Sequence, residues 1–111
     1  MRVDEEAFAE DLANARAAAK AAIEPDVRSL EAEGVPVASL RPCEAEAQDG
    51  TQLPGCVKRY IPQPDGRWGA VFSIDSEASK PALVLLAVGE RHPGAPWKPS
   101  VYEIAHRRFN R

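Results

Sequence analysis

Residues 82–88 constrain the fold of this 111-residue chain more than any other stretch, because they read ALVLLAV without one polar side chain. An apolar run of this length is typical of a β-strand that is covered on both faces. It is far shorter than the roughly 18–20 apolar residues that a membrane-spanning helix needs. The run therefore predicts a central strand of a sheet with packing on both sides.

Charged residues follow this apolar run after a single glycine. Gly89 is followed by Glu90, Arg91 and His92. A strand that only fills a core can end in any turn, whereas a strand with arginine and histidine at its exit can direct them at a ligand. Arg91 and His92 are therefore candidate functional residues.

Two further strands are expected before this one. Residues 57–61 read as a strand, and the proline- and glycine-rich residues 62–66 form a turn. Residues 67–74 then alternate, with Trp68, Ala70, Phe72 and Ile74 on one face. Three strands joined by short polar turns predict an antiparallel meander.

The N-terminal part is expected to be helical. Asp4 can cap a helix over residues 4–23, and apolar residues recur there at helical spacing. Pro25 fits the first turn of a second helix that stops at Gly34, which gives a helical hairpin over 1–34. Residues 35–55 are expected to be a mostly irregular connection, with room for a short strand at 35–40 and a mobile part at 44–51.

The C-terminal part is expected to hold a loop and a short helix. Residues 92–99 contain three prolines and Trp97, which predicts a loop. Ser100 and Glu103 have the spacing of a capping box, so a helix should follow to about residue 108. Tyr102 and His106 lie one turn apart on the same face of this helix.

Charge and cysteine content narrow the class of protein. The net charge of −3 divides into an excess of seven acidic groups over residues 1–55 and four basic groups over 56–111. A basic C-terminal half suits a polyanion. The acidic N-terminus is unlike a signal peptide, which predicts a cytoplasmic protein. Cys43 and Cys56 are too few for a disulfide scaffold and lack zinc-ligand spacing, so we expect reduced thiols and no metal.

Four segments in order resemble one family. They are LPGCVKRYI (53–61), GRWGAVFSID (66–75), LVLLAVGERH (83–92) and SVYEIAHRRF (100–109). Together with the helical hairpin, they resemble the RelE/ParE superfamily of toxins from bacterial toxin–antitoxin pairs. The resemblance implies a single α+β domain over 1–111, in which an N-terminal helical hairpin packs on a twisted antiparallel sheet of three to four strands, with a short C-terminal helix. Within this domain, residues 1–34 form the helical hairpin, 35–55 the connection, and 56–111 the sheet and the C-terminal helix.

The resemblance also implies an activity. RelE-type members are ribosome-dependent endoribonucleases that cleave mRNA, whereas ParE-type members poison DNA gyrase, and a cognate antitoxin protein neutralises both. The expected partners are therefore an antitoxin and mRNA on the ribosome, with no cofactor, no metal and no membrane. The alternatives are a non-enzymatic ParE-like toxin, an inactive interaction module of the same fold, or an unrelated α+β domain. The oligomeric state is left open.

Candidate catalytic residues follow from the family's motif positions. Arg91 matches the arginine after the glycine that ends the long strand, Tyr102 matches the tyrosine that opens the last helix, and Lys58 matches the first lysine of the strand after the loop. The second lysine of that strand falls on Tyr60. The arginine of the next strand falls on Gly69, and Arg67, two residues earlier, could replace it.

The remaining candidates have less specific signals. His92 and His106 could transfer protons, and Arg59, Trp97, Arg107 and Arg108 could contact RNA. Structural roles compete with each of these. Arg91 could instead pair with Glu90 or Glu103, Tyr102 could be a core residue, and Trp97 could pin its loop to the core.

Overall fold

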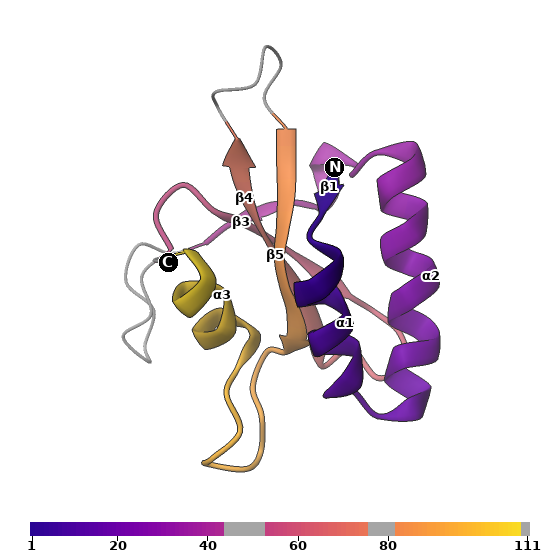
Figure 1. The fold of residues 1–111 in the computed structure, drawn as a ribbon, viewed down its shortest axis with the longest axis vertical. Coiled ribbons are helices and arrows are strands. Elements are labelled where there is room, and N and C mark those ends of the chain that lie inside the picture. Colours follow the sequence, from indigo (N-terminus) through magenta and orange to yellow (C-terminus); the bar gives the residue numbers. More distant parts are fainter. Residues whose placement is uncertain (44–52, 76–81, 110–111) are drawn as a thin grey trace.

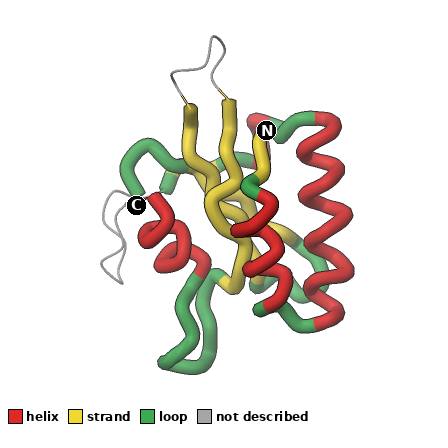
Figure 2. Tube along the Cα trace, viewed as in Figure 1, coloured by secondary structure: helices red, strands yellow, loops and turns green. Residues whose placement is uncertain are grey.

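The computed structural model describes residues 1–43, 53–75 and 82–109. The helices are α1 (Glu5–Ala13), α2 (Ala17–Glu33) and α3 (Val101–Phe109), with a 3₁₀ turn, η1, at Val37–Ser39. The strands are β1 (Arg2–Val3), β2 (Arg41–Pro42), β3 (Val57–Ile61), β4 (Trp68–Asp75) and β5 (Ala82–Glu90). The predicted α+β class is confirmed (Figure 2).

The strands form one mixed sheet in the order β1-β5-β4-β3-β2. Strands β3, β4 and β5 pair antiparallel in sequence order, as the meander predicted. The short strand β2 continues this pattern at one edge, where Arg41 lies opposite Lys58. At the other edge β1 pairs parallel to β5 through Arg2 and Val3. Within the described residues, the sheet therefore has five strands and one parallel pair, whereas three to four antiparallel strands were expected.

Two hydrophobic clusters cover the two faces of the sheet. Helices α1 and α2 lie on one side and α3 lies on the other (Figure 1). We call these the hairpin face and the α3 face. The hairpin-face cluster consists of Phe8, Leu12, Ala19, Ile23, Val27, Ile61, Trp68, Ala70, Phe72, Leu85 and Val88. The α3-face cluster consists of Leu53, Cys56, Val71, Ala87, Val101 and Ala105. Strand β5 contributes to both clusters, so it is covered on both faces as its sequence predicted.

The hairpin is present, but the break between its helices lies at residues 14–16 instead of at Glu24 and Pro25. Pro25 lies inside α2 with its side chain exposed. A proline at this position removes one helical hydrogen bond. Helix α2 nevertheless continues, because its inner face buries four side chains, three of which belong to the hairpin-face cluster. The four buried side chains are Ala19, Ile23, Val27 and Leu30.

Three predicted helix-terminal residues, Asp4, Gly34 and Ser100, agree with the structure. The Asp4 carboxylate accepts hydrogen bonds from the backbone N–H groups of Glu6 and Ala7, both at 3.2 Å. Gly34 ends α2 with a positive φ of 86°. At α3, the Ser100 hydroxyl accepts the Glu103 N–H at 3.2 Å, as the capping box predicted.

Other predicted segments differ or fall outside the described residues. Residues 35–40 contain η1, and the strand follows at β2. The expected mobile stretch 44–51, most of the turn before residue 82, and Arg111 lie outside the described residues. Within the described ranges, no helix combines the length and the apolar character needed to cross a membrane.

Candidate functional site

Strand β3 sends alternate side chains to opposite faces of the sheet. Cys56 just before it belongs to the α3-face cluster, so Lys58 and Tyr60 point to that face. Arg59 points to the hairpin face, where its guanidinium pairs with Asp26 of α2 at 2.6 Å. The structure thus places Lys58 and Arg59, which are neighbours in sequence, on different sides of the molecule.

Arg91 follows β5 directly and extends across the α3 face. Its guanidinium carbon lies 4.2 Å from the centroid of the Tyr60 ring, and one of its terminal nitrogens donates to the Gly66 carbonyl at 2.9 Å. Gly69 makes room for this side chain, since a Cβ at that position would lie 2.9 Å from Arg91 Cγ. The buried Nε–H of Arg91 has no hydrogen-bond partner in the described part of the chain. Arg91 is therefore held in place with one donor unused.

Tyr102, near the start of α3, lies beside Lys58 on the same face of the sheet. The ammonium nitrogen of Lys58 lies 5.3 Å from the centre of the Tyr102 ring and 5.8 Å from that of Tyr60. Burial raises the pKa of Tyr102, the neighbouring Tyr60 raises it further, and the charge and hydrogen bond of Arg91 oppose both effects. Because the usual pKa of 10.0 is raised, the phenol keeps its proton at neutral pH and can donate a hydrogen bond. We call Lys58, Tyr60, Arg91 and Tyr102 the cation–tyrosine site.

Among the described residues, no carboxylate neutralises the cations of this site. In the described ranges 1–43, 53–75 and 82–109, neither Lys58 nor Arg91 forms an ion pair with a carboxylate. Glu90 pairs instead with Lys98 at 2.6 Å. The alternative that Arg91 is merely neutralised by Glu90 or Glu103 is therefore not what the structure has. Two positive charges beside two phenols make a site suited to an anion.

The other predicted catalytic residues are close to members of this site through a backbone contact, through the chain or through a shared helix. Arg67 is exposed just before β4, and its backbone carbonyl accepts the Arg91 N–H at 2.9 Å. His92 is exposed directly after Arg91. His106 is half-buried on α3, one turn after Tyr102. The roles of these three residues in catalysis stay predictions.

The predicted RNA-contact residues are scattered. Trp97 is 86% exposed in the loop between β5 and α3, so it does not pin that loop to the core. Arg107 is exposed on α3. Arg108 lies on the other side of α3, where its guanidinium pairs with Asp11 at 2.8 Å. Arg108 and Arg59 are thus both engaged with carboxylates of the helical hairpin, away from the cation–tyrosine site.

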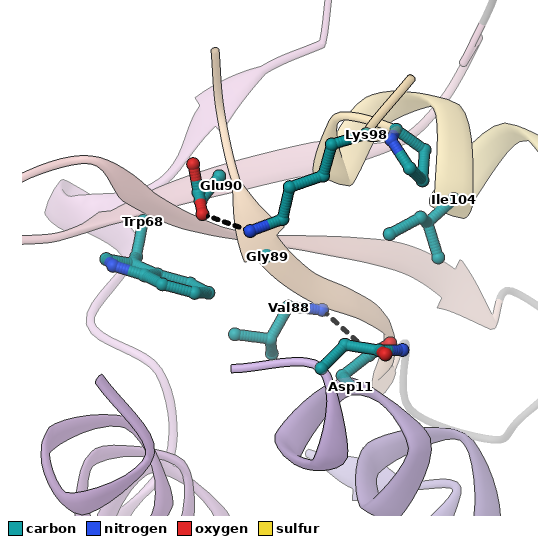
Figure 3. Close-up of a pocket in the computed structure, with 9 residues that line it drawn as sticks. Asp11, Trp68, Val88, Gly89, Glu90, Lys98 and Ile104 are labelled. Carbon is teal, nitrogen blue, oxygen red and sulfur yellow. Dashed lines mark hydrogen bonds and ion pairs between the residues drawn. The ribbon is translucent and has the colours of Figure 1, made fainter. Parts of the chain in front are cut away.

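A separate groove of about 200 Å³ lies along the outer edge of β5 (Figure 3). Trp68 flanks it, the Lys98–Glu90 ion pair spans one side, and Asp11 accepts the Val88 N–H at 2.9 Å. It is lined by Asp11, Asn14, Trp68, Val88, Gly89, Glu90, Lys98, Pro99 and Ile104. Its acidic side chains are already paired, and it contains none of the predicted catalytic residues. We therefore assign the candidate function to the cation–tyrosine site.

Tyr60 was not among the predicted site residues, because it stands where the family pattern has a lysine. The spacing Lys58-Arg59-Tyr60 was the available signal, because residues two apart on a strand share a face. Among the described residues, no three side chains of the metal-binding types gather into a candidate metal site.

Comparisons with known proteins add no identification. No protein-family model matches the chain, and neither a curated protein nor a solved structure matches it.

Proposed function

We propose that this protein is a RelE-like toxin that cleaves RNA at the cation–tyrosine site. The observation that carries the proposal is the convergence of Lys58, Arg91 and Tyr102. They come from β3, from the residue after β5 and from α3. The Lys58 ammonium nitrogen nevertheless lies 5.3 Å from the centre of the Tyr102 ring, and both Lys58 and Arg91 contact the ring of Tyr60. These are the three positions that the family resemblance implied.

The proposed reaction uses the ribose 2′-hydroxyl of the RNA, the cations of this site and groups that take up and return a proton. The ribose 2′-hydroxyl attacks the adjacent phosphate, a bond to phosphorus forms, and the bond to the 5′-oxygen breaks. Negative charge gathers on the phosphate oxygens in the transition state, and fixed cationic donors stabilise it there. The guanidinium of Arg91 and the ammonium group of Lys58 supply those donors, whereas the buried Nε–H of Arg91 is not accessible to RNA.

Tyr102 has a positioning role in this proposal. Its phenol is protonated at neutral pH, so it donates a hydrogen bond to the ribose or the phosphate instead of acting as a base. His92 and His106 are the proposed proton-transfer groups, and Arg67 adds positive charge at the rim. Trp97 and Arg107 remain proposed contacts to RNA outside the site. The substrate would be mRNA on the ribosome, in the cytoplasm, and an antitoxin would be the natural inhibitor.

Induced expression in a bacterial host, with mapping of mRNA 5′ ends, tests this function. We expect cleavage within codons of translated messages. Arg91→Ala and Lys58→Ala each remove a cationic donor, so each should lower cleavage on the order of 10²-fold. Tyr102→Phe should lower it while retaining the fold. Lys98→Ala is the matched control, because it removes a cation that pairs with Glu90 outside the site.

Three outcomes would overturn the proposal. If a folded Arg91→Ala/Tyr102→Phe double variant cleaves as well as the original protein, the site assignment fails. If messages stay intact while DNA supercoiling changes, the protein is a gyrase-directed toxin of the ParE type. If neither changes, the result favours a decayed toxin or an inactive interaction module of the same fold.

A further inference from the structure

Cys43 and Cys56 lie opposite one another at the ends of two neighbouring strands of the sheet. Cys43 follows β2 and Cys56 precedes β3, one step beyond the pair Pro42 and Val57. The backbone N–H of Cys43 donates to the Cys56 carbonyl at 3.0 Å. Residues directly opposite in an antiparallel pair have Cα atoms about 4.5–5.5 Å apart, and a disulfide requires roughly 4.4–6.8 Å. The backbone spacing therefore suits a bridge.

The two side chains also lie on the same side of the sheet. Cys56 is a buried member of the α3-face cluster, and Cys43 is half-buried against that cluster. The thiol of Cys56 raises the pKa of Cys43 through its charge, in addition to the larger effect of burial. The thiols are thus close enough to act on each other, and both are free in this structure.

This pair borders the cation–tyrosine site. The charge of Lys58 lowers the pKa of Cys43, and Cys43 in turn raises that of Tyr102. Lys58 lies two residues after Cys56 on the same face of the chain. A covalent change at the cysteines would therefore take place at the wall of the site.

We propose that Cys43 and Cys56 are a dithiol modification site, which a small disulfide such as glutathione disulfide converts reversibly into a cross-strand bridge. The partly exposed Cys43 thiol first gives up its proton to the buffer, and the small thiolate fraction attacks one sulfur of glutathione disulfide, forms a mixed disulfide and releases one glutathione thiolate. The Cys56 thiolate then attacks the Cys43 sulfur and releases the second glutathione. The protein dithiol loses two electrons and two protons, and glutathione disulfide gains them. The reverse exchange with glutathione restores the thiols.

The bridge would tie β2 to β3 at the edge of the sheet. Strand β2 has only two residues, so few ladder hydrogen bonds hold it there. A cross-link between Cys43 and Cys56 restricts the unfolded chain by closing the loop between them, and this raises stability. The chemistry depends only on the cysteine pair, and its place beside an RNA site rests on the proposed function.

The test equilibrates the purified full chain in glutathione buffers of increasing glutathione disulfide content. We expect the two free thiols to disappear together. The intact mass should fall by two hydrogen atoms, a digest should yield a linked pair of peptides containing Cys43 and Cys56, and non-reducing electrophoresis should show a monomer. The oxidised form should also have a higher urea midpoint than the reduced form.

Cys43→Ser is the matched control, because it removes the half-exposed partner and leaves Cys56 in place. It should show no bridge and no rise of the urea midpoint under oxidising conditions. The proposal is overturned if the original protein accumulates stable glutathione adducts, forms disulfide-linked dimers, or keeps both thiols at every buffer ratio. None of these measurements involves RNA cleavage, so failure here is distinguishable from failure of the proposed function.

Discussion

Arg108 donates hydrogen bonds to both carboxylate oxygens of Asp11, at 2.8 and 2.9 Å, although the two residues lie 97 positions apart. The same carboxylate accepts the backbone N–H of Val88, and the same guanidinium donates to the Leu86 carbonyl at 2.8 Å. Strand β1 pairs with β5 only at residues 84–85. The ion pair therefore satisfies backbone groups of β5 where its strand partner has ended, and it joins α1, β5 and α3.

Removing one member of this pair should destabilise the fold strongly. The side chains of Arg108 and Asp11 are only 8% and 5% exposed, so Arg108→Ala would leave a buried carboxylate without its cation. A loss of about 3–5 kcal/mol in the free energy of unfolding is expected. Urea denaturation measures it. Arg28→Ala breaks an exposed ion pair with Glu5 and should shift the urea midpoint far less. Equal shifts for the two variants would contradict this explanation.

Gly69→Ala should impair the proposed activity without altering any charged residue. The new methyl group would lie 2.9 Å from Arg91 Cγ, so the Arg91 side chain must move away from Tyr60. Displacing a substrate-positioning group by about 1 Å can lower a rate on the order of 10²-fold. Quantified mRNA cleavage after induced expression measures the effect.

The cross-strand partner of Gly69 supplies the control for that variant. Gly89 lies directly opposite it in β5. A Cβ at Gly89 would meet Val101 Cβ at 3.5 Å, an ordinary van der Waals distance. Gly89→Ala should therefore leave cleavage close to normal. Full activity of Gly69→Ala would show that the position of Arg91 does not matter.

Replacing the proline inside α2 should stabilise the protein. Pro25 is exposed, and within a helix it lacks the N–H that would bond to the carbonyl of Ala21. Pro25→Ala restores this bond and should raise the free energy of unfolding by about 1–3 kcal/mol. Thermal and urea unfolding measure the gain, and Glu24→Ala at the neighbouring exposed position should change little. Destabilisation by Pro25→Ala would mean that the proline supports the hairpin.

Stability should fall at alkaline pH under reducing conditions. Burial raises the pKa of Cys43 from 9.0 to about 11, and it raises the pKa values of Cys56 and Tyr102 as well. The unfolded chain gives up these protons at lower pH than the folded protein does. The unfolded state is thus increasingly favoured as the pH rises from about 9 to 11.

Urea midpoints at about pH 7.5 and 10.5, measured with a reductant present, follow this effect. Cys43→Ser should make the midpoint less dependent on pH over this range, because it removes one of the shifted groups. A midpoint that stays constant or rises with pH would be inconsistent with buried thiols.

The sequence identified elements whose signals are local. The meander, the Asp4 cap and the Ser100 capping box all depend on patterns within a few residues, and the structure has them. Strand β1 was missed because two residues are too few to show alternation and its partner lies about eighty positions away. The break at 14–16 was missed because Pro25 was a stronger local signal, yet packing of α2 on the sheet outweighed it.

The candidate site residues also fall into those that the sequence predicts and those whose contacts it does not predict. Lys58, Arg91 and Tyr102 were placed by motif position, and the structure brings them together. Arg59 and Arg108 were indistinguishable from other surface cations in sequence. Their partners, Asp26 and Asp11, belong to the hairpin and become neighbours only when it packs against the sheet. Long-range ion pairs of this kind leave no periodic signal.

The alternation of β3 has one more consequence. Lys58 serves the cation–tyrosine site while Arg59, the next residue, holds α2. A substitution at either position affects one side of the molecule. Deleting a single residue between Cys56 and Lys58 would reverse which face each side chain of the strand occupies. The contacts on both faces of the sheet would then be lost together, so we expect a deletion in this strand to be more damaging than a substitution at one position.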